Sequence, residues 1–306
     1  MINRPSISFI ILTFNEERHI RRCIGSVMDI AADVFIVDSY SIDRTCELAN
    51  SLGAKVYQNS WVNYATQFNW ALNNLPIKTE WVFRLDADEI ITDSLRRRLV
   101  ERIDQLPEAI TGVYMGRRVH FLGRWIRHGA AYPMYVLRLF RFGKGYCEKR
   151  WMDEHIKITE GKTDKIDADI IDDSKKSLGW WTEKHNQYAL REAIDLLNMK
   201  FKIVVEDSIV PRLCGTQEQR NRWLKARYAS LPLFVRPVVY FAYRYFIKFG
   251  FLDGVEGLIW HFLQGLWYRF LVDAKIYEIY HKGGTDSKSI KQVIEQEYGI
   301  DLKAVI

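Results

Sequence analysis

Apolar runs and amphipathic segments alternate along the first hundred or so residues, and this alternation limits what the chain can fold into. Four runs rich in β-branched and aromatic residues, typical of buried strands, cover residues 6–13, 33–38, 54–57 and 81–85. Segments with apolar residues at helical spacing follow them, at residues 20–28, 41–53, 64–75 and 94–106. We expect Ser41 to cap the second helix and Gly53 to end it. This order predicts an α/β fold with a mostly parallel central sheet flanked by helices.

Polar side chains follow three of these strands at the same end. Thr13 ends the first strand, Asp38 ends the second, and Asp86 and Asp88 follow the fourth. Ligands of parallel sheets bind at the carboxyl ends of the strands, and carboxylate oxygens suit Mg²⁺ or Mn²⁺ shared with substrate phosphates. A single D-x-D is more often a solvated acidic turn before a helix. The convergence of three strand ends favours a metal and diphosphate site instead.

Length and composition bound the rest of the chain. A sequence of 306 residues that is 48% hydrophobic can form one large domain, or one domain with an appendage. The four cysteines form no C-x-x-C pair, which predicts a reducing compartment without a zinc cluster or disulfide framework. The apolar run at residues 7–14 lacks a cleavage site and is read as a strand, not as a signal peptide. No apolar stretch is long enough for a transmembrane helix.

The pattern changes after Gly112. Further strands in antiparallel or mixed pairing are predicted at residues 112–122 and 134–142, and a short one at residues 156–159. Residues 162–174 are polar and are expected to be peripheral, and residues 180–200 predict a helix. We therefore expect a catalytic domain at residues 1–215, a helical segment at 216–282 and a polar tail with one short helix at 283–306.

The segment before this tail is both basic and aromatic. Residues 219–252 contain seven basic side chains and no acidic one, which indicates an anionic partner, either phosphate or a membrane surface. Residues 231–280 are dense in aromatic residues and predict two amphipathic helices separated by a turn at Asp253-Gly254. Such helices lie in the membrane interface, where long basic side chains reach anionic headgroups. A helical hairpin packed on the catalytic domain, or a homodimer interface, is the alternative.

Taken together, these motifs resemble the family 2 glycosyltransferases, which are inverting enzymes with the GT-A fold. The resemblance covers about residues 6–160 and rests on four motifs in the family's order: Thr13-Phe14-Asn15-Glu16, Val37-Asp38-Ser39, Asp86-Ala87-Asp88, and the acidic pair before His155. The first half is most similar to the branch that includes bacterial lipopolysaccharide-core and capsule glycosyltransferases.

The resemblance implies a nucleotide site in the first two loops. In the family, the first loop and the acid after the second strand hold the base and the ribose. The positions that carry this role here are Thr13, Asn15, Glu16 and Asp38. A carboxylate can accept a uracil N–H or a ribose hydroxyl. The family's usual second acid is replaced by Ser39.

The resemblance also assigns the metal site to the D-x-D motif. Asp88 is expected to ligate Mg²⁺ or Mn²⁺, and Asp86 to hold the ribose or a metal-bound water, or to join the metal ligands. The cation would neutralise the diphosphate leaving group. His155 is expected to complete the metal shell or bind the diphosphate, with a structural hydrogen bond as the alternative.

The general base and the acceptor site follow from two later motifs. The family takes the acceptor proton with an acid from an E-D pair, and this chain has Asp153-Glu154 in the opposite order. Asp153 is the first candidate and Glu154 the second. The Q-x-x-R-W motif of processive polysaccharide synthases is matched by Gln219, Arg222 and Trp223, which would lie near the acceptor or diphosphate. A basic helix face is the alternative.

We therefore predict an inverting glycosyltransferase that moves a sugar from a nucleotide-sugar, expected to be a UDP-sugar, to a lipid-linked saccharide in bacterial lipopolysaccharide or surface-polysaccharide biosynthesis. It is expected to be cytoplasmic and peripheral on the inner face of the cytoplasmic membrane, without a nucleic-acid partner. A sugar nucleotidyltransferase would need a glycine-rich loop after the first strand, which Phe14-Asn15-Glu16-Glu17 does not provide. An inactive carbohydrate-binding or scaffold protein is the other alternative, and the intact D-x-D argues against it.

Overall fold

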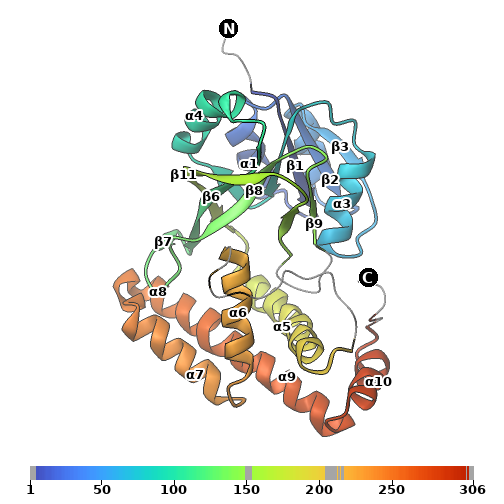
Figure 1. Ribbon diagram of the computed structural model, residues 1–306, viewed down its shortest axis with the longest axis vertical. Helices are drawn as coiled ribbons and strands as arrows, with labels where there is room; N and C mark the ends of the chain where they lie inside the picture. Colours follow the sequence, from blue (N-terminus) through green and yellow to red (C-terminus); the bar gives the residue numbers. More distant parts are fainter. Residues whose placement is uncertain are drawn as a thin grey trace. The chain divides into compact units, whose positions relative to one another are not determined.

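The computed structural model describes residues 5–148, 154–203, 212, 214, 217–300 and 302, and it divides into two compact units (Figure 1). The first unit comprises residues 1–127, 131–147 and 155–175. The second comprises residues 128–130, 148–154 and 176–306. The domain boundaries proposed after residues 215 and 282 differ from this division and remain predictions.

The first unit is built on a nine-stranded mixed sheet with the order β3-β2-β1-β4-β8-β6-β11-β5, and β7 pairs with β6. The first four strands in the chain are parallel: β1 (Ile7–Thr13), β2 (Asp33–Asp38), β3 (Lys55–Gln58) and β4 (Trp81–Asp86). The others are β5 (Glu89–Ile91), β6 (Ile110–Phe121), β7 (Arg124–Ile126), β8 (Tyr135–Arg141) and β11 (Lys162–Asp173). Strand β8 runs antiparallel to both β4 and β6. A separate pair is formed by β9 (Gly145–Cys147) and β10 (Ile156–Ile158).

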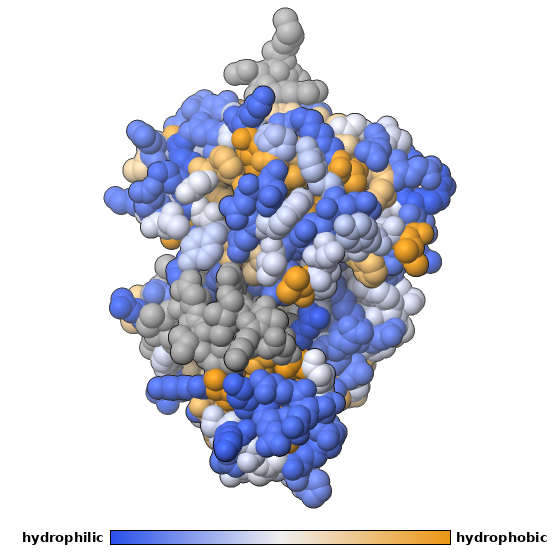
Figure 2. Space-filling model, turned by 90° about the vertical axis from the view of Figure 1, so that its right-hand side faces the viewer, coloured by the Kyte–Doolittle hydropathy of each residue, from blue (hydrophilic) through white to orange (hydrophobic). Residues whose placement is uncertain are grey.

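Helices cover both faces of this sheet, which explains why the strands read as continuous apolar runs. The helices are α1 (Ile20–Val27), α2 (Thr45–Ser51), α3 (Tyr64–Asn74) and α4 (Asp93–Arg102), with a 3₁₀ turn η1 (Ile103–Gln105) after the last. Along β1, Phe9 and Ile11 pack into the core cluster shared with α1, α2 and α4. Ile10, between them, packs with Phe68 of α3 on the other face. Hydrophilic residues cover most of the first unit on the face shown in Figure 2.

Two local expectations are wrong. The segment expected to be peripheral is strand β11, which lies inside the sheet between β6 and β5 and buries Ile166, Ala168 and Ile170. Four of its five acidic residues, which made the segment look solvated, are paired with arginines from other elements. Ser41 does not cap the second helix, because α2 begins at Thr45 and Ser41 bonds to the loop after β1 instead.

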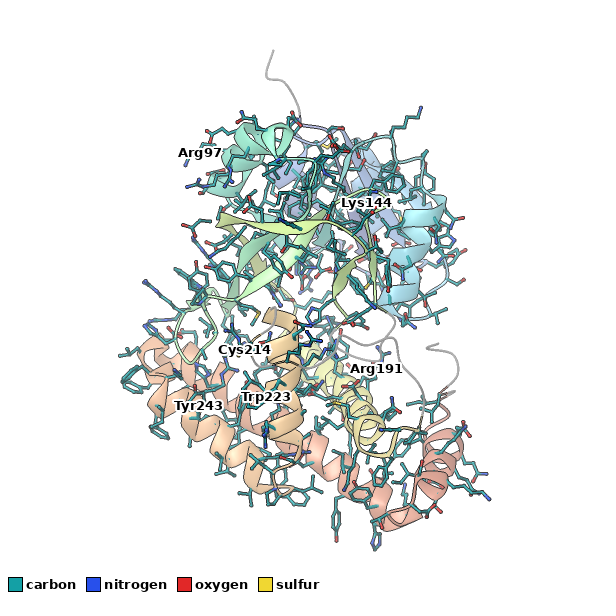
Figure 3. The ribbon with its side chains drawn as sticks, viewed as in Figure 1. Arg97, Lys144, Arg191, Cys214, Trp223 and Tyr243 are labelled. Carbon is teal, nitrogen blue, oxygen red and sulfur yellow. The ribbon has the colours of Figure 1, made fainter. Side chains whose placement is uncertain are left out.

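The second unit is helical among its described residues. Its long elements are α5 (Leu178–Phe201), α6 (Gln217–Ala229), which carries Trp223 (Figure 3), α9 (Tyr268–Gly283) and α10 (Ser287–Glu297). Between α6 and α9 the chain forms α7 (Val235–Ala242), the π-helix η2 (Tyr243–Ile247), the 3₁₀ turn η3 (Gly250–Asp253), α8 (Gly254–Trp260) and the π-helix η4 (His261–Trp267).

The core of this unit joins α5, α9 and α10. Ala193 and Leu197 of α5 meet Val272 of α9, and Ile290 and Ile294 of α10 are buried in the same cluster. The short helix expected in the polar tail is therefore present and contributes to the core. Among the described residues, every helix is too short or too polar to cross a bilayer.

Candidate functional site at the strand ends

The sheet register places three polar strand ends in one row. Thr13 of β1 is the parallel partner of Asp38 of β2, and Leu12 is the partner of Asp86 of β4. The Thr13 hydroxyl donates to Asp38 Oδ1 at 2.9 Å. Two of the side chains expected to converge at this edge, those of Thr13 and Asp38, are therefore in direct contact.

Asp38 is a fixed, fully buried acceptor. Ser41 donates to it twice, from its hydroxyl to Oδ1 at 2.5 Å and from its backbone N–H to Oδ2 at 2.8 Å. Burial acts to raise the pKa of Asp38, but the hydrogen bonds from Ser41 and Thr13 outweigh it and the pKa lies below its ordinary value. Asp38 therefore stays a carboxylate at neutral pH, with its orientation set before any ligand arrives.

Asn15 and Glu16 tie the first loop to the loop after β2. Asn15 adopts a left-handed backbone (φ 54°), donates its N–H to Ser41 Oγ at 2.8 Å and accepts the Ile42 N–H on Oδ1 at 2.9 Å. The Glu16 carboxylate contacts Nδ1 of buried His19 at 2.6 Å. Both side chains thus support the loop, and a nucleotide contact by either remains a prediction.

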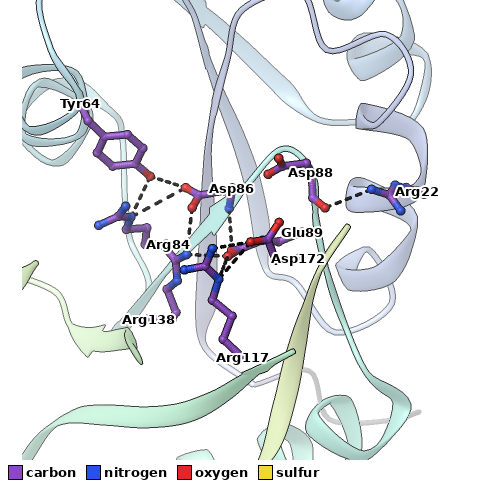
Figure 4. A network of polar contacts seen from close by, with 9 residues as sticks. All are labelled: Arg22, Tyr64, Arg84, Asp86, Asp88, Glu89, Arg117, Arg138 and Asp172. Carbon is purple, nitrogen blue, oxygen red and sulfur yellow. Dashed lines mark hydrogen bonds and ion pairs between the residues drawn. The ribbon is translucent and has the colours of Figure 1, made fainter. Parts of the chain in front are cut away.

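The Asp86 carboxylate lies in a partly buried polar network drawn in Figure 4. Tyr64 donates its hydroxyl hydrogen to Oδ1 at 2.5 Å, and Arg138 donates to Oδ2 at 2.8 Å. Arg84 donates to the Tyr64 oxygen at 2.7 Å and stacks on the Tyr64 ring, with its Nε 3.9 Å from Asp86 Oδ1. Two guanidinium groups therefore hold this carboxylate from one side.

Glu89 shares Arg138 with Asp86. Arg138 lies 2.6 Å from Glu89 Oε1, and Glu89 Oε2 accepts the Asp86 N–H at 3.0 Å. Burial acts to raise the pKa of Asp86, but Arg138 and Arg84 outweigh it and hold the pKa well below its usual range. Burial and the neighbouring charge of Asp86 raise the pKa of Glu89 to about 8, although Arg138 opposes this. Arg138 serves both carboxylates, and Arg117 Nε lies 3.9 Å from Glu89 Oε1. Of the two acids, Asp86 has the lowered pKa and Glu89 the raised pKa.

The turn after Asp86 is anchored through its backbone. The Asp88 carbonyl oxygen accepts Arg22 at 3.1 Å and the Asp173 N–H at 3.1 Å, and Arg22 also pairs with the Asp173 carboxylate at 2.7 Å. These contacts join α1, the turn and the end of β11, so the position of Asp88 is set by elements far apart in sequence. In Figure 4 the contact drawn for Asp88 runs through this carbonyl, on the far side from its carboxylate.

The two acids of the D-x-D differ in their fitness for a divalent cation. Two arginines neighbour the Asp86 carboxylate and would repel a dication placed against it. The Asp88 carboxylate is partly exposed at the turn and suits Mg²⁺ or Mn²⁺, which commonly take one or two protein carboxylates and fill the other positions with water and phosphate. Among the described residues, no group of three or more His, Cys, Asp or Glu side chains could hold a metal by itself. The residues present fit a cation shared with a phosphorylated ligand.

The predicted general base is not placed by the structure. Asp153 lies outside the described residues. Glu154 and His155 are described and partly buried, directly before β10, and Glu154 belongs to the second unit. Their predicted roles remain predictions.

The Q-x-x-R-W motif lies on α6, where Arg222 is buried and pairs with fully buried Glu148 at 2.5 Å within the second unit. Gln219 and Trp223 are partly exposed, and the Arg227 guanidinium lies 5.1 Å from the Trp223 ring centroid. Arg222 therefore has a structural partner that sequence reasoning missed, and acceptor or diphosphate binding by the motif remains a prediction.

Sequence reasoning also missed the residues that hold Asp86 in place, namely Tyr64, Arg84, Glu89 and Arg138. A signal for two of them was present. Arg84 interrupts the apolar run of β4, and Arg138 interrupts that of β8. A charge inside a buried strand needs a partner, but the sequence does not show which one.

Comparisons with known proteins identify the class. Residues 8–159 match the glycosyl transferase family 2 model. An uncharacterized glycosyltransferase of Rickettsia bellii (strain RML369-C) is 42% identical over 90 residues, which is 29% of this chain and 30% of that relative. The lipopolysaccharide core biosynthesis glycosyltransferase LpsC of Rhizobium meliloti (strain 1021) is 28% identical over 284 residues, 91% of this chain and 94% of LpsC. Glucosyl-3-phosphoglycerate synthase from Mycobacterium tuberculosis, solved with Mn²⁺, UDP and glucosyl-3-phosphoglycerate, aligns with a TM-score of 0.32 at 22% identity, covering 38% of this chain and 45% of that one.

The chain belongs to the family 2 glycosyl transferases and is related to LpsC. The predicted family and enzyme class are therefore confirmed. So is the predicted GT-A type of α/β fold with a helical C-terminal region, although the sheet is mixed beyond β4.

Proposed function

We propose that this protein transfers a sugar from a UDP-sugar to a hydroxyl of a lipid-linked saccharide, with inversion, in the biosynthesis of lipopolysaccharide or a related surface polysaccharide. One observation carries the proposal: within the family domain, Asp38 and the Asp86-Ala87-Asp88 turn lie at the carboxyl ends of the two parallel strands that flank β1. Ligands of such sheets bind at this edge.

The nucleotide is proposed to bind against Asp38. Its carboxylate is oriented by Thr13 and Ser41 and acts only as an acceptor. It can take the imide N–H of uracil or a ribose hydroxyl. Because the group is already charged and fixed, binding needs little reorganisation.

The diphosphate is proposed to share a divalent cation with Asp88. When bound, Mg²⁺ or Mn²⁺ would neutralise the charge that builds on the leaving diphosphate. Asp86, held by Arg138 and Tyr64, is proposed to accept a hydrogen bond from a ribose hydroxyl or from a water of that cation.

The acceptor hydroxyl is proposed to lose its proton to Asp153 or Glu154 as its oxygen attacks the anomeric carbon. The bond from that carbon to the diphosphate oxygen breaks as the new bond forms on the opposite face, so an α-linked donor gives a β-glycoside.

The acceptor class and location rest on two supports. The relationship to LpsC extends over 94% of that protein, which its name places in lipopolysaccharide core biosynthesis. The second unit also exposes many large apolar side chains. We propose peripheral attachment to the inner face of the cytoplasmic membrane, where a lipid-linked saccharide would be within reach.

Donor-dependent stabilisation tests the proposal. The wild type, Asp88→Asn and the matched control Asp167→Asn, an exposed acid on β11, would be melted with UDP-, GDP-, CMP- and dTDP-sugars, with and without Mn²⁺. A UDP-sugar with Mn²⁺ should stabilise the wild type and the control by about 2.7 kcal/mol at a hundredfold excess over the dissociation constant. Asp88→Asn should lose the Mn²⁺-dependent part.

Two outcomes would count against the proposal. Equal stabilisation of Asp88→Asn and the wild type would remove the D-x-D from the metal site. Stabilisation without any release of UDP, with or without saccharide acceptors, would favour a binding protein that has lost catalysis.

A further inference from the structure

The second unit contains a helical hairpin with an apolar end. Helix α7 and η2 lead outward, η3 makes the turn, and α8 and η4 return beside α7, where the rings of Phe241 and Phe262 are 6.4 Å apart (Figure 1). We call residues 246–255 the hairpin tip. Its exposed apolar side chains are Phe246, Ile247, Phe249, Phe251, Leu252 and Val255. Ile247 and Val255 are 65% and 67% exposed, so this is a protruding surface rather than the rim of a core.

The exposed rings are joined into one series of ring contacts through Phe241 and Tyr245, which are half-buried. Phe262 contacts Phe241, which contacts Phe246, and Tyr245 then links Phe246 to Phe251 through ring contacts of 5.2 and 6.2 Å. Phe251 in turn lies 6.1 Å from Phe249. Contiguous apolar surface of this kind marks an interaction site, whereas single exposed apolar residues do not.

Two of the three basic residues in residues 231–262, Arg236 and Arg244, are buried. Arg236 is buried against Asp273, with Nε 2.8 Å from the carboxylate, and Arg244 is buried and donates to the Gly129 carbonyl at 2.6 Å. The two arginines that suggested anionic headgroups therefore have protein partners. In residues 231–262, all of which the structure describes, Lys248 is the one exposed charged residue, and Glu256 is half-buried. The hairpin thus buries three of its five charged residues and exposes large apolar side chains, the reverse of an ordinary water-exposed hairpin.

Several backbone groups and one buried carboxylate at the tip are hydrogen-bonded within the second unit. The Lys248 N–H donates to Tyr243 at 2.9 Å, and the Leu252 N–H donates to Phe249 at 3.0 Å. The Lys248 carbonyl accepts the Gly129 N–H at 2.8 Å. Buried Asp253 accepts the His128 N–H at 2.8 Å. A segment that enters hydrocarbon must pair its polar groups within the protein, and these groups of the tip are paired in this way. The buried His261 ring beside Gly250 is an exception, because neither of its nitrogens has a hydrogen-bond partner among the described residues.

We propose that the hairpin tip inserts into the hydrocarbon layer of a lipid bilayer and that this apolar insertion, not charge attraction, anchors the protein. The proposal rests on the membrane location given under the proposed function and deepens it. Consecutive residues such as Phe246 and Ile247 are both exposed, so the apolar surface covers more than one side of the tip. A protein partner would need one complementary face, whereas a fluid acyl layer accepts apolar groups on all sides. The near absence of exposed charge complements hydrocarbon and leaves Lys248 as a single contact for a headgroup.

Vesicle flotation of the full chain, without donor or acceptor, tests this inference. Neutral phosphatidylcholine vesicles would be compared with vesicles containing about 30% phosphatidylglycerol, at about 50 and 500 mM NaCl. We expect binding to both, changing by no more than about twofold with salt because exposed charge contributes little. The variant Ile247→Glu/Phe249→Glu should bind at least about tenfold more weakly, since two apolar side chains lose their burial in lipid.

Three control variants and a second variant of the tip complete the test. Val62→Glu, an equally exposed apolar position in the first unit, and Lys248→Gln should bind as the wild type does. Val255→Glu should weaken binding independently of the first variant. Asp88→Asn should also bind normally, so that failure of the catalytic proposal and failure of this one give different results.

Other outcomes would overturn the inference. Binding restricted to anionic vesicles and abolished by salt would mean attraction to headgroups. A wild-type dimer that becomes monomeric in Ile247→Glu/Phe249→Glu, without vesicle binding by the wild type, would mean that a second copy covers the tip.

Discussion

Replacing Arg236 by methionine tests whether this arginine is a lipid-facing base, as its sequence context suggests, or a structural ion. In the structure its side chain is 2% exposed, with Nε and one terminal nitrogen 2.8 and 2.5 Å from Asp273 Oδ1. Its other nitrogen donates to the Ala229 carbonyl at 3.0 Å. Methionine would leave Asp273 buried, holding only the Phe234 N–H at 2.8 Å among these contacts.

The expected cost follows from the orphaned carboxylate. Removing one partner of a buried ion pair lowers the free energy of unfolding by about 3–5 kcal/mol. That is a large part of the free energy of unfolding of a typical protein, which is roughly 5–15 kcal/mol in total. The deficit should shrink at acid pH, because an unpaired buried carboxylate has a raised pKa and is relieved by protonation.

Urea unfolding followed by tryptophan fluorescence would measure this loss. Arg220→Met, at an exposed position of α6, is the matched control and should change stability by less than about 0.5 kcal/mol. In the double variant Arg236→Met/Asp273→Asn the buried charge is gone while an acceptor for the Phe234 N–H remains. We expect it to regain most of the loss. If Arg236→Met lowers the free energy of unfolding no more than Arg220→Met does, the buried pair is not formed. Arg236 would then not be a buried charge of the hairpin.

Two further predictions concern a buried acid and a glycine. Because the folded-state pKa of Glu89 is raised from 4.5 to about 8, the folded protein binds this proton more tightly than the unfolded chain. Its contribution to stability should therefore fall as pH rises between these values, by at most about 1.4 kcal/mol per pH unit. Urea unfolding of Glu89→Gln should lack this fall, and a parallel pH profile would refute a protonated Glu89. Gly129→Ala should cost at least about 2 kcal/mol, because φ is +67° and a Cβ would lie 2.0 Å from the buried His261 ring. Gly123→Ala, with φ +85° and open space around it, should cost about half as much in the same assay.

The strand ends were the part of the site that the sequence could predict. An apolar run that stops at a carboxylate indicates both a buried strand and the end at which its acid emerges. Parallel order then brings Thr13, Asp38 and Asp86 to one edge. This inference needs only local patterns, since strand length and side-chain chemistry are written in a few adjacent residues.

The surroundings of those acids could not be predicted in the same way. Arg138, which holds Asp86, lies on β8, 52 residues later in the chain. Tyr64 lies on α3, 22 residues earlier. Which charge meets which is decided when β8 pairs antiparallel to β4. The sequence showed that a buried arginine needs a partner, but only the sheet register selected it.

In the second unit, too, the sequence predicted some properties and only the tertiary structure decided others. Its aromatic density and helical spacing were visible in the sequence, and so was the absence of a long apolar span. The sequence did not show which way the charged side chains point, because a helix with both basic and aromatic residues can bury either face. Arg236 meets Asp273 across 37 residues, and Arg244 meets the Gly129 carbonyl across 115. Composition determined that this segment is apolar and basic, whereas the tertiary structure decided which of these properties faces outward, because a buried charge is tolerated only where a distant partner is brought to it.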